Sequence, residues 1–100
     1  MPVAIEMDRD RLADACVRHG VRTLKVFGAS VAGDFDPEHS DVDFLVTFHE
    51  VADLAEAYFG LKSELEEIVD RSVDLVFEDH IRNPYFLATV MAGSLDLYAA

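Results

Sequence analysis

Two aspartates, Asp41 and Asp43, stand one residue apart at the start of the strongly apolar segment 41–48. In an extended strand, residues two apart point to the same side, so the two carboxylates project together while Val42 and Phe44 cover the other face. Adjacent carboxylates repel each other and are costly to desolvate without a partner. Mg²⁺ is commonly held by one or two carboxylates, completed by waters and substrate phosphates. The pair therefore predicts a magnesium site that handles phosphates.

A glycine-bearing turn lies just upstream of these acids, at residues 28–33. A short turn that exposes backbone N–H groups beside the acids would hold the phosphates of a nucleotide. The candidate nucleotide-binding residues are Gly28, Ala29, Ser30 and Gly33. A simple helix cap is an equally supported interpretation of Ser30.

A third acid, Asp74, interrupts the otherwise apolar segment 73–77. Phosphoryl transfer needs positioned cations and donors around the phosphates, together with a carboxylate that takes a proton from the attacking hydroxyl. We therefore predict a nucleotidyl-transfer site with Asp41, Asp43 and Asp74 as the catalytic and metal-binding residues. The alternative for Asp74 is an edge-strand charge that discourages aggregation.

The elements that must position these residues follow from periodicity and capping signals. Helical spacing predicts helices at 8–19, 53–70 and 83–93, with Asp53 and Asn83 as the N-terminal caps of the second and third. A stripe of apolar residues from Leu54 to Ile68 is the expected core face of the second helix. Alternating or continuous apolar segments predict strands at 21–27, 41–48 and 73–77, and the tail at 95–98 suits a last strand or a helix end. The expected fold is α/β (α+β): one domain, 1–100, with a mixed sheet of three or four strands and helices mainly on one side.

The net charge of the chain limits its partners. Twenty acidic against eight basic residues give a formal charge of −12. Binding to nucleic acid depends on Lys and Arg side chains that neutralise phosphates, so we expect no direct nucleic acid binding by this acidic chain. The acidity either aids solubility or matches a basic partner, and composition alone leaves both open.

Apolar segments in the chain are far shorter than a membrane span, and the N-terminus lacks a basic-then-apolar signal pattern, so we expect a cytoplasmic protein without membrane contact. Cys16 is the single cysteine and falls among the apolar positions of a predicted helix, which favours core packing. The four histidines show no metal-ligand spacing, and surface positions are expected for them. Whether the chain forms a homo-oligomer stays open.

The motifs together resemble those of the minimal nucleotidyltransferases of the DNA polymerase β superfamily. The resemblance rests on Phe27-Gly28-Ala29-Ser30-Val31-Ala32-Gly33-Asp34, followed by Ser40-Asp41-Val42-Asp43-Phe44 and by Val73-Asp74-Leu75-Val76. The family pattern is Gly-Ser, about ten residues, then Asp-x-Asp, with a third acid on a neighbouring strand. The resemblance covers nearly the whole chain.

This resemblance implies a fold, an activity and a partner. It implies that Asp41, Asp43 and Asp74 hold Mg²⁺, as one ion or two, with ATP as substrate. Members of the family are commonly antitoxins of HEPN-domain ribonuclease toxins. They transfer AMP to a toxin tyrosine, in the manner of type VII systems, or they neutralise the toxin by binding it.

The chain departs from the family pattern Gly-Ser-x-Ala-Arg-Gly in its turn. Alignment on Gly28 and Gly33 puts Ala29 at the serine position, whereas alignment on the ten-residue spacing makes Ser30 the serine. The arginine is missing in either case, with Ala32 in its place under the first alignment. Arginine is a strong bidentate phosphate donor, so its loss predicts weaker nucleotide binding. The alternative function is an acidic binding module, weak or inactive as an enzyme, that neutralises the toxin by complex formation.

Overall fold

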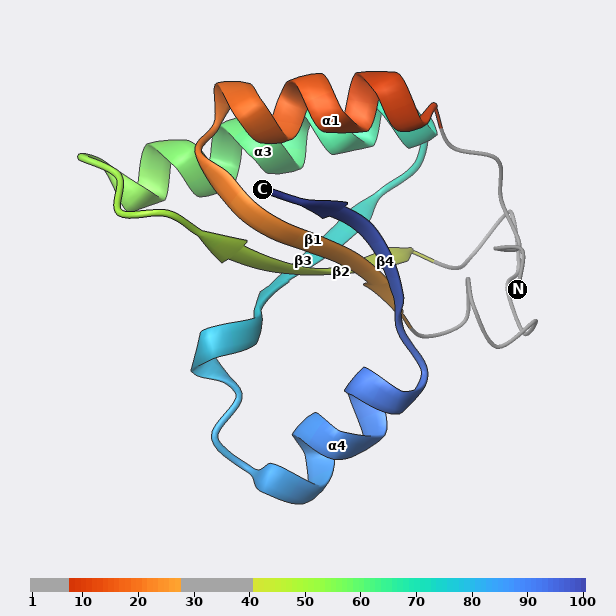
Figure 1. Cartoon of the computed structure of the whole chain (residues 1–100). Helices are drawn as coiled ribbons and strands as arrows, with labels where there is room; N and C mark the ends of the chain where they lie inside the picture. The colour runs from red at the N-terminus through yellow and green to blue at the C-terminus, as the bar shows by residue number, and fades with distance from the viewer. Residues whose placement is uncertain (1–7, 28–40) are drawn as a thin grey trace.

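The computed structural model describes residues 8–27 and 41–100, and these fold into a four-stranded sheet with helices (Figure 1). The helices are Arg9–Arg18 (α1), Leu54–Val69 (α3), Pro84–Ala92 (α4) and the short 3₁₀ helix Glu78–His80 (η1). The strands are Val21–Phe27 (β1), Val42–Phe48 (β2), Val73–Phe77 (β3) and Leu95–Ala99 (β4).

The sheet is mixed, with the strand order β3-β2-β1-β4. Strand β1 pairs antiparallel with both β2 and β4, whereas β2 pairs parallel with β3. The prediction of a mixed sheet is therefore confirmed, and the tail is a strand that extends the sheet. The parallel pair requires a crossover connection, which α3 provides.

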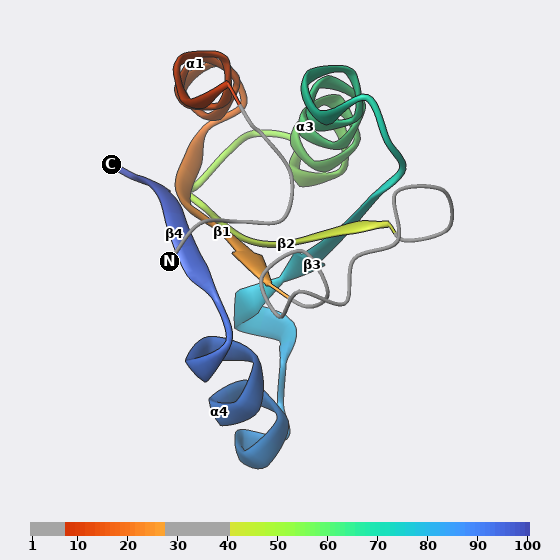
Figure 2. The same ribbon diagram turned by 90° about the vertical axis from the view of Figure 1, so that its right-hand side faces the viewer.

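Helices α1 and α3 lie side by side on one face of the sheet (Figure 2). They enclose the hydrophobic core with alternate residues of β1, β2 and β3, among them Leu24, Phe44 and Leu75. Helix α4 lies on the other side of the sheet and follows η1 (Figure 2). The prediction that helices pack mainly on one side is confirmed, and the second face, which α4 covers in part (Figure 2), carries Asp43 and Asp74.

Short-range signals explain where α1 begins and ends. The side chain of Asp8 accepts hydrogen bonds from the backbone N–H groups of Asp10 and Arg11, which have no partner within the helix. Gly20 follows the C-cap with φ of +73°, a left-handed conformation that glycine adopts without strain. A Cβ atom at Gly20 would lie 2.7 Å from Cγ1 of Val51, so the chain also needs glycine there for space.

The buried stripe of α3 differs from the predicted one. Its fully or nearly buried residues are Ala57, Leu61, Leu65 and Val69. Leu54, which we expected in the core, is 43% exposed because it starts the helix beyond the edge of the core. Asp53 caps the helix as predicted by accepting from the backbone N–H of Glu56.

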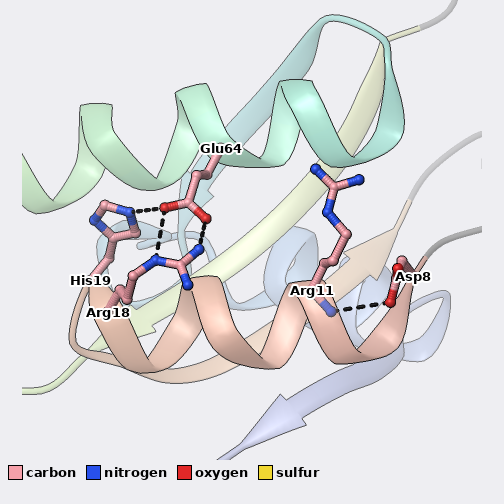
Figure 3. A network of polar contacts seen from close by, with 5 residues as sticks. All are labelled: Asp8, Arg11, Arg18, His19 and Glu64. Atoms are coloured by element: carbon pink, nitrogen blue, oxygen red, sulfur yellow. Dashed lines mark hydrogen bonds and ion pairs between the residues drawn. The ribbon is translucent and has the colours of Figure 1, made fainter.

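An ion-pair network joins the end of α1 to the middle of α3 (Figure 3). The carboxylate of Glu64 pairs with Arg18 and lies 2.8 Å from Nε2 of His19. The network lowers the pKa of Glu64, chiefly through the hydrogen bond from Arg18. Gly60 makes room for His19, because a Cβ atom there would lie 2.8 Å from the imidazole ring. His19 is thus half-buried, not the surface residue we expected.

No helix within residues 8–27 and 41–100 is long and apolar enough to cross a membrane.

Candidate functional site

Asp43 lies on the face of β2 that points away from α1 and α3. Its neighbours Val42 and Phe44 are fully buried in the core, so the pleat of the strand turns Asp43 to the opposite side. Asp43 is half-buried, while Asp41, just before the strand, is exposed. The buried strand therefore presents the Asp43 carboxylate on the face that the two large helices leave open.

Asp74 stands directly beside Asp43 on the neighbouring strand. In the parallel ladder of β2 and β3, Asp43 is the register partner of Asp74. Register partners share one face of a sheet, and neighbouring strands lie about 4.8 Å apart. Phe27 is the partner of Asp43 on the other side, in β1. The structure thus places Asp43 and Asp74 side by side on the open face, with Asp41 two residues before Asp43 along the chain; these three acids are hereafter called the acid row.

Side chains of α3 hold β3 in the register that aligns the two acids. Strand β3 lies at the edge of the sheet, so half of its backbone groups lack a strand partner. The carboxylate of Glu66 accepts from the backbone N–H of Val73 at 3.1 Å, and the hydroxyl of Tyr58 donates to the carbonyl of Leu75 at 2.6 Å. These bonds satisfy the outer edge on both sides of Asp74 and so fix its position.

Charge repulsion is concentrated at Asp43. Its pKa is raised, first because partial burial removes water from the carboxylate, and then because Asp74 and Asp41 bring negative charge close to it. A cation bound beside such a carboxylate would offset the repulsion from the neighbouring acids and favour its ionised form. The electrostatics of the acid row therefore fit a cation-binding site.

The chemistry of these donors suits Mg²⁺ better than an ion enclosed by protein alone. Within residues 8–27 and 41–100, no group of three or more His, Cys, Asp or Glu side chains is placed to hold a metal ion, so the three predicted acids do not form a complete set of ligands by themselves. Mg²⁺ usually takes one or two carboxylates and completes its shell with waters and substrate phosphates. The half-buried Asp43 beside the exposed Asp74 offers such an open set of oxygen ligands.

The predicted phosphate-holding turn lies outside the described residues. Gly28, Ala29, Ser30 and Gly33 follow directly after β1, whose last residue, Phe27, is the partner of Asp43. The role of these four residues stays a prediction from the sequence.

Sequence reasoning missed an ion pair on the same face as the acid row. The ammonium of Lys25 in β1 lies 2.8 Å from a carboxylate oxygen of Glu78 in η1 and 3.8 Å from Sδ of Met91 in α4. Lys25 is the register partner of Leu45, two residues along β2 from Asp43. The available signal was a lysine between the apolar residues Leu24 and Val26, but its partner is 53 residues away in the chain.

The structure also separates the aromatic residues whose roles the sequence left open. Tyr85 and Phe86 are 84% and 52% exposed at the start of α4, whereas Tyr98 packs against the core. Asn83 caps this helix as predicted, by accepting from the backbone N–H groups of Tyr85 and Phe86. Helix α4 therefore displays aromatic side chains on the same side of the sheet as the acid row.

Replacing Asp43 with asparagine is expected to stabilise the metal-free protein at pH 7. The raised pKa means that ionised Asp43 opposes folding above that pKa, and the penalty disappears as the pH falls and the carboxyl gains its proton. Like charges directly opposite in a sheet cost about 0.5 kcal/mol, which corresponds to roughly 2–4 °C in Tm for a domain of this size. Thermal unfolding with EDTA at pH 7 and near pH 4 measures the effect.

The gain in Tm should shrink at the lower pH. A lower Tm of the Asp43→Asn variant at pH 7 would contradict the repulsion inferred for the acid row.

The fold and the acid row define a nucleotidyltransferase, and comparison with known proteins places the chain in that class. Residues 9–95 match the nucleotidyltransferase domain family, so the chain belongs to it. A solved structure described as a candidate minimal nucleotidyltransferase has 32% sequence identity and a TM-score of 0.72, with 87% of this chain and 86% of that chain covered. The chain is thus a member of the minimal nucleotidyltransferases, which confirms the family suggested by its motifs.

Two relatives carry names that state an activity. The chain is 34% identical over 73 residues to MJ0128 of Methanocaldococcus jannaschii, a candidate protein adenylyltransferase; the match covers 73% of this chain and 72% of that protein. It is 39% identical over 66 residues to the protein adenylyltransferase MntA of Thermococcus cleftensis, with 66% and 65% covered. At 19% identity and a TM-score of 0.71, the fold also matches a chain of a toxin–antitoxin crystal structure with AMP-PNP, over 94% of this chain and 75% of that one.

Proposed function

We propose that this protein is an antitoxin that transfers AMP from ATP to a tyrosine hydroxyl of a HEPN-domain ribonuclease toxin, with Mg²⁺ as cofactor. The observation that carries the proposal is the register pairing of Asp43 with Asp74 on the open face of the sheet. The names of the relatives support the reaction, because two of them are described as protein adenylyltransferases. The toxin–antitoxin complexes of the same fold support the partner.

Each carboxylate of the acid row has a role in the proposed reaction. Asp41 and Asp43 would hold Mg²⁺ together with the triphosphate, and Asp74 would complete the site and take the proton of the acceptor hydroxyl. The hydroxyl oxygen forms a bond to the α-phosphorus, the bond between the α- and β-phosphates breaks, and pyrophosphate leaves. The metal ion, when bound, neutralises the phosphate charge that the acids alone would repel.

Incubation with ATP labelled in the α-phosphate, Mg²⁺ and a HEPN toxin tests the reaction. Label on the toxin, with release of pyrophosphate, is expected from the wild-type protein. Omission of Mg²⁺ or addition of EDTA should abolish the label. A wild-type protein that neutralises the toxin without labelling it would overturn the enzymatic proposal.

A second candidate function is neutralisation of the toxin by binding alone. It is favoured by helix α4, which has no charged residue and exposes Tyr85 and Phe86. A second copy is a poor occupant for this helix, since two chains of charge −12 repel each other. A toxin surface with an apolar patch and basic residues around it matches both features.

Affinity for the toxin, measured against salt and against EDTA, separates the two functions. If binding alone neutralises the toxin, the affinity falls with salt, ignores EDTA and survives the combined changes Asp41→Asn and Asp43→Asn. The variant Tyr85→Ser, Phe86→Ser then weakens the complex by roughly tenfold or more, as expected for two exposed anchors. Neutralisation that needs ATP, Mg²⁺ and both aspartates would eliminate the binding-only function.

A further inference from the structure

A basic side chain stands beside the acid row, on the same face of the sheet. Among the register-paired residues of β1, β2 and β3, all of them described by the structure, Lys25 is the only Lys or Arg. Lys25 and Leu45 form one row across the strands, and Phe27, Asp43 and Asp74 form the next. Diagonal neighbours in an antiparallel pair lie about 7–8 Å apart, which is within reach of a lysine side chain.

The ammonium of Lys25 forms its ion pair with Glu78 of η1. It contacts Glu78 at 2.8 Å and Met91 at 3.8 Å, and its side chain is only 15% exposed. Asp96 of β4 is its register partner on the far side. Lys25 is thus a largely buried cation whose neighbours are Glu78, Asp96 and the apolar Met91. In the nucleotide-free protein its ammonium pairs with Glu78, not with Asp43 or Asp74.

A bound triphosphate would compete with Glu78 for the ammonium of Lys25. A triphosphate held at the acid row brings several negative charges within the reach of Lys25. Lysine is a common phosphate ligand because its compact ammonium donates up to three hydrogen bonds from a flexible stem. The chain also lacks the motif arginine, with alanine at position 32 under the alignment on the two turn glycines.

We propose that Lys25 is a phosphate-binding residue of the nucleotide site, held by Glu78 until the triphosphate of ATP takes its ammonium. This inference rests on the proposed function and adds to it a source of positive charge from β1. Lys25 contacts the β- or γ-phosphate, so it discriminates ATP from AMP. Glu78 acts as a counter-ion that keeps the buried ammonium paired in the free protein.

Isothermal titration of the variants with Mg²⁺–ATP and with AMP tests the proposal. The change Lys25→Met keeps the apolar stem and removes the charge. It should weaken ATP binding by about tenfold to hundredfold, as expected for the loss of hydrogen bonds to a charged group, and leave AMP binding unchanged. The variant Lys25→Arg keeps the charge and should retain most of the preference for ATP.

Two further variants distinguish phosphate binding from a purely structural role of the ion pair. The change Glu78→Gln frees the ammonium and should leave ATP binding equal to wild type or a few-fold tighter. Arg18→Met is the matched control, because Arg18 pairs with Glu64 between α1 and α3, in the layer on the opposite face. It should not alter the affinity for either nucleotide.

Several results would overturn the proposal. An unchanged ratio of ATP to AMP affinity in a folded Lys25→Met protein would overturn it and leave the proposed function standing. Equal loss of ATP affinity in Lys25→Met and Glu78→Gln would show that the ion pair only ties β1 to η1. If Lys25→Met does not fold, loss of the preference for ATP in a folded Lys25→Arg protein overturns it as well. A wild-type protein that binds no ATP would overturn both this inference and the proposed function.

Discussion

Replacement of Asp43 by alanine is expected to lower the rate of AMP transfer by at least about 10³-fold, because metal-assisted charge stabilisation contributes several kcal/mol to such reactions. Asp43 is the central acid of the row, with Asp74 beside it in register and Asp41 close enough to raise its pKa. Transfer of label from ATP to the toxin, measured under single-turnover conditions, gives the rate.

The matched control for this prediction removes a charge elsewhere. Glu67 is an exposed acid of α3, in the layer on the opposite face of the sheet. The change Glu67→Gln should leave the rate within about twofold of wild type, whereas Asp43→Asn should lose nearly as much activity as Asp43→Ala. Because Asp43→Asn is also expected to unfold at a higher temperature, a drop in rate cannot be ascribed to unfolding. Transfer that survives Asp43→Ala would refute the assignment of the site.

Replacement of Phe44 by alanine is expected to destabilise the fold by about 3–5 kcal/mol, which is the usual range for a buried phenylalanine. Phe44 is fully buried between the sheet and the helices α1 and α3. A domain of this size has a free energy of unfolding of about 5–15 kcal/mol, so the variant loses a large part of its stability. Urea denaturation followed by circular dichroism measures the change.

Phe59 provides the control for this second prediction. It carries the same side chain on α3 but is 66% exposed, and it contacts the ring of Tyr58 edge-on at 5.1 Å. The change Phe59→Ala should cost about 0.5 kcal/mol or less. Equal destabilisation by the two variants would mean that Phe44 does not anchor the core that supports the acid row.

The order and type of the elements could be predicted from the sequence because local signals decide them. Helices α3 and α4 begin next to the expected caps Asp53 and Asn83, and α1 begins one residue after its predicted start at Asp8. The phase of β2 followed from the apolar residues Val42 and Phe44, whose burial turns Asp43 to the other side. Periodicity and capping act within a few residues, and a single sequence displays them directly.

The alignment of the acids and the buried face of α3 depend on tertiary structure, which local sequence signals do not predict. The alignment of Asp43 with Asp74 depends on the register of two strands separated by a helix, and Glu66 and Tyr58 of that helix hold the register from the edge. The helical stripe on α3 was misplaced at Leu54 because the extent of the core, not periodicity, decides which turn is buried.

The sequence by itself thus determined the elements and the family, and it predicted which acids carry the chemistry. Only the tertiary structure decided that the acid row shares its face with Lys25, whose partner Glu78 is 53 residues away. Such a contact forms when distant strands and a connecting turn pack together, and its stability depends on burial at both ends. The physical reason is that register and burial are properties of the assembled sheet, which no local window of the chain contains.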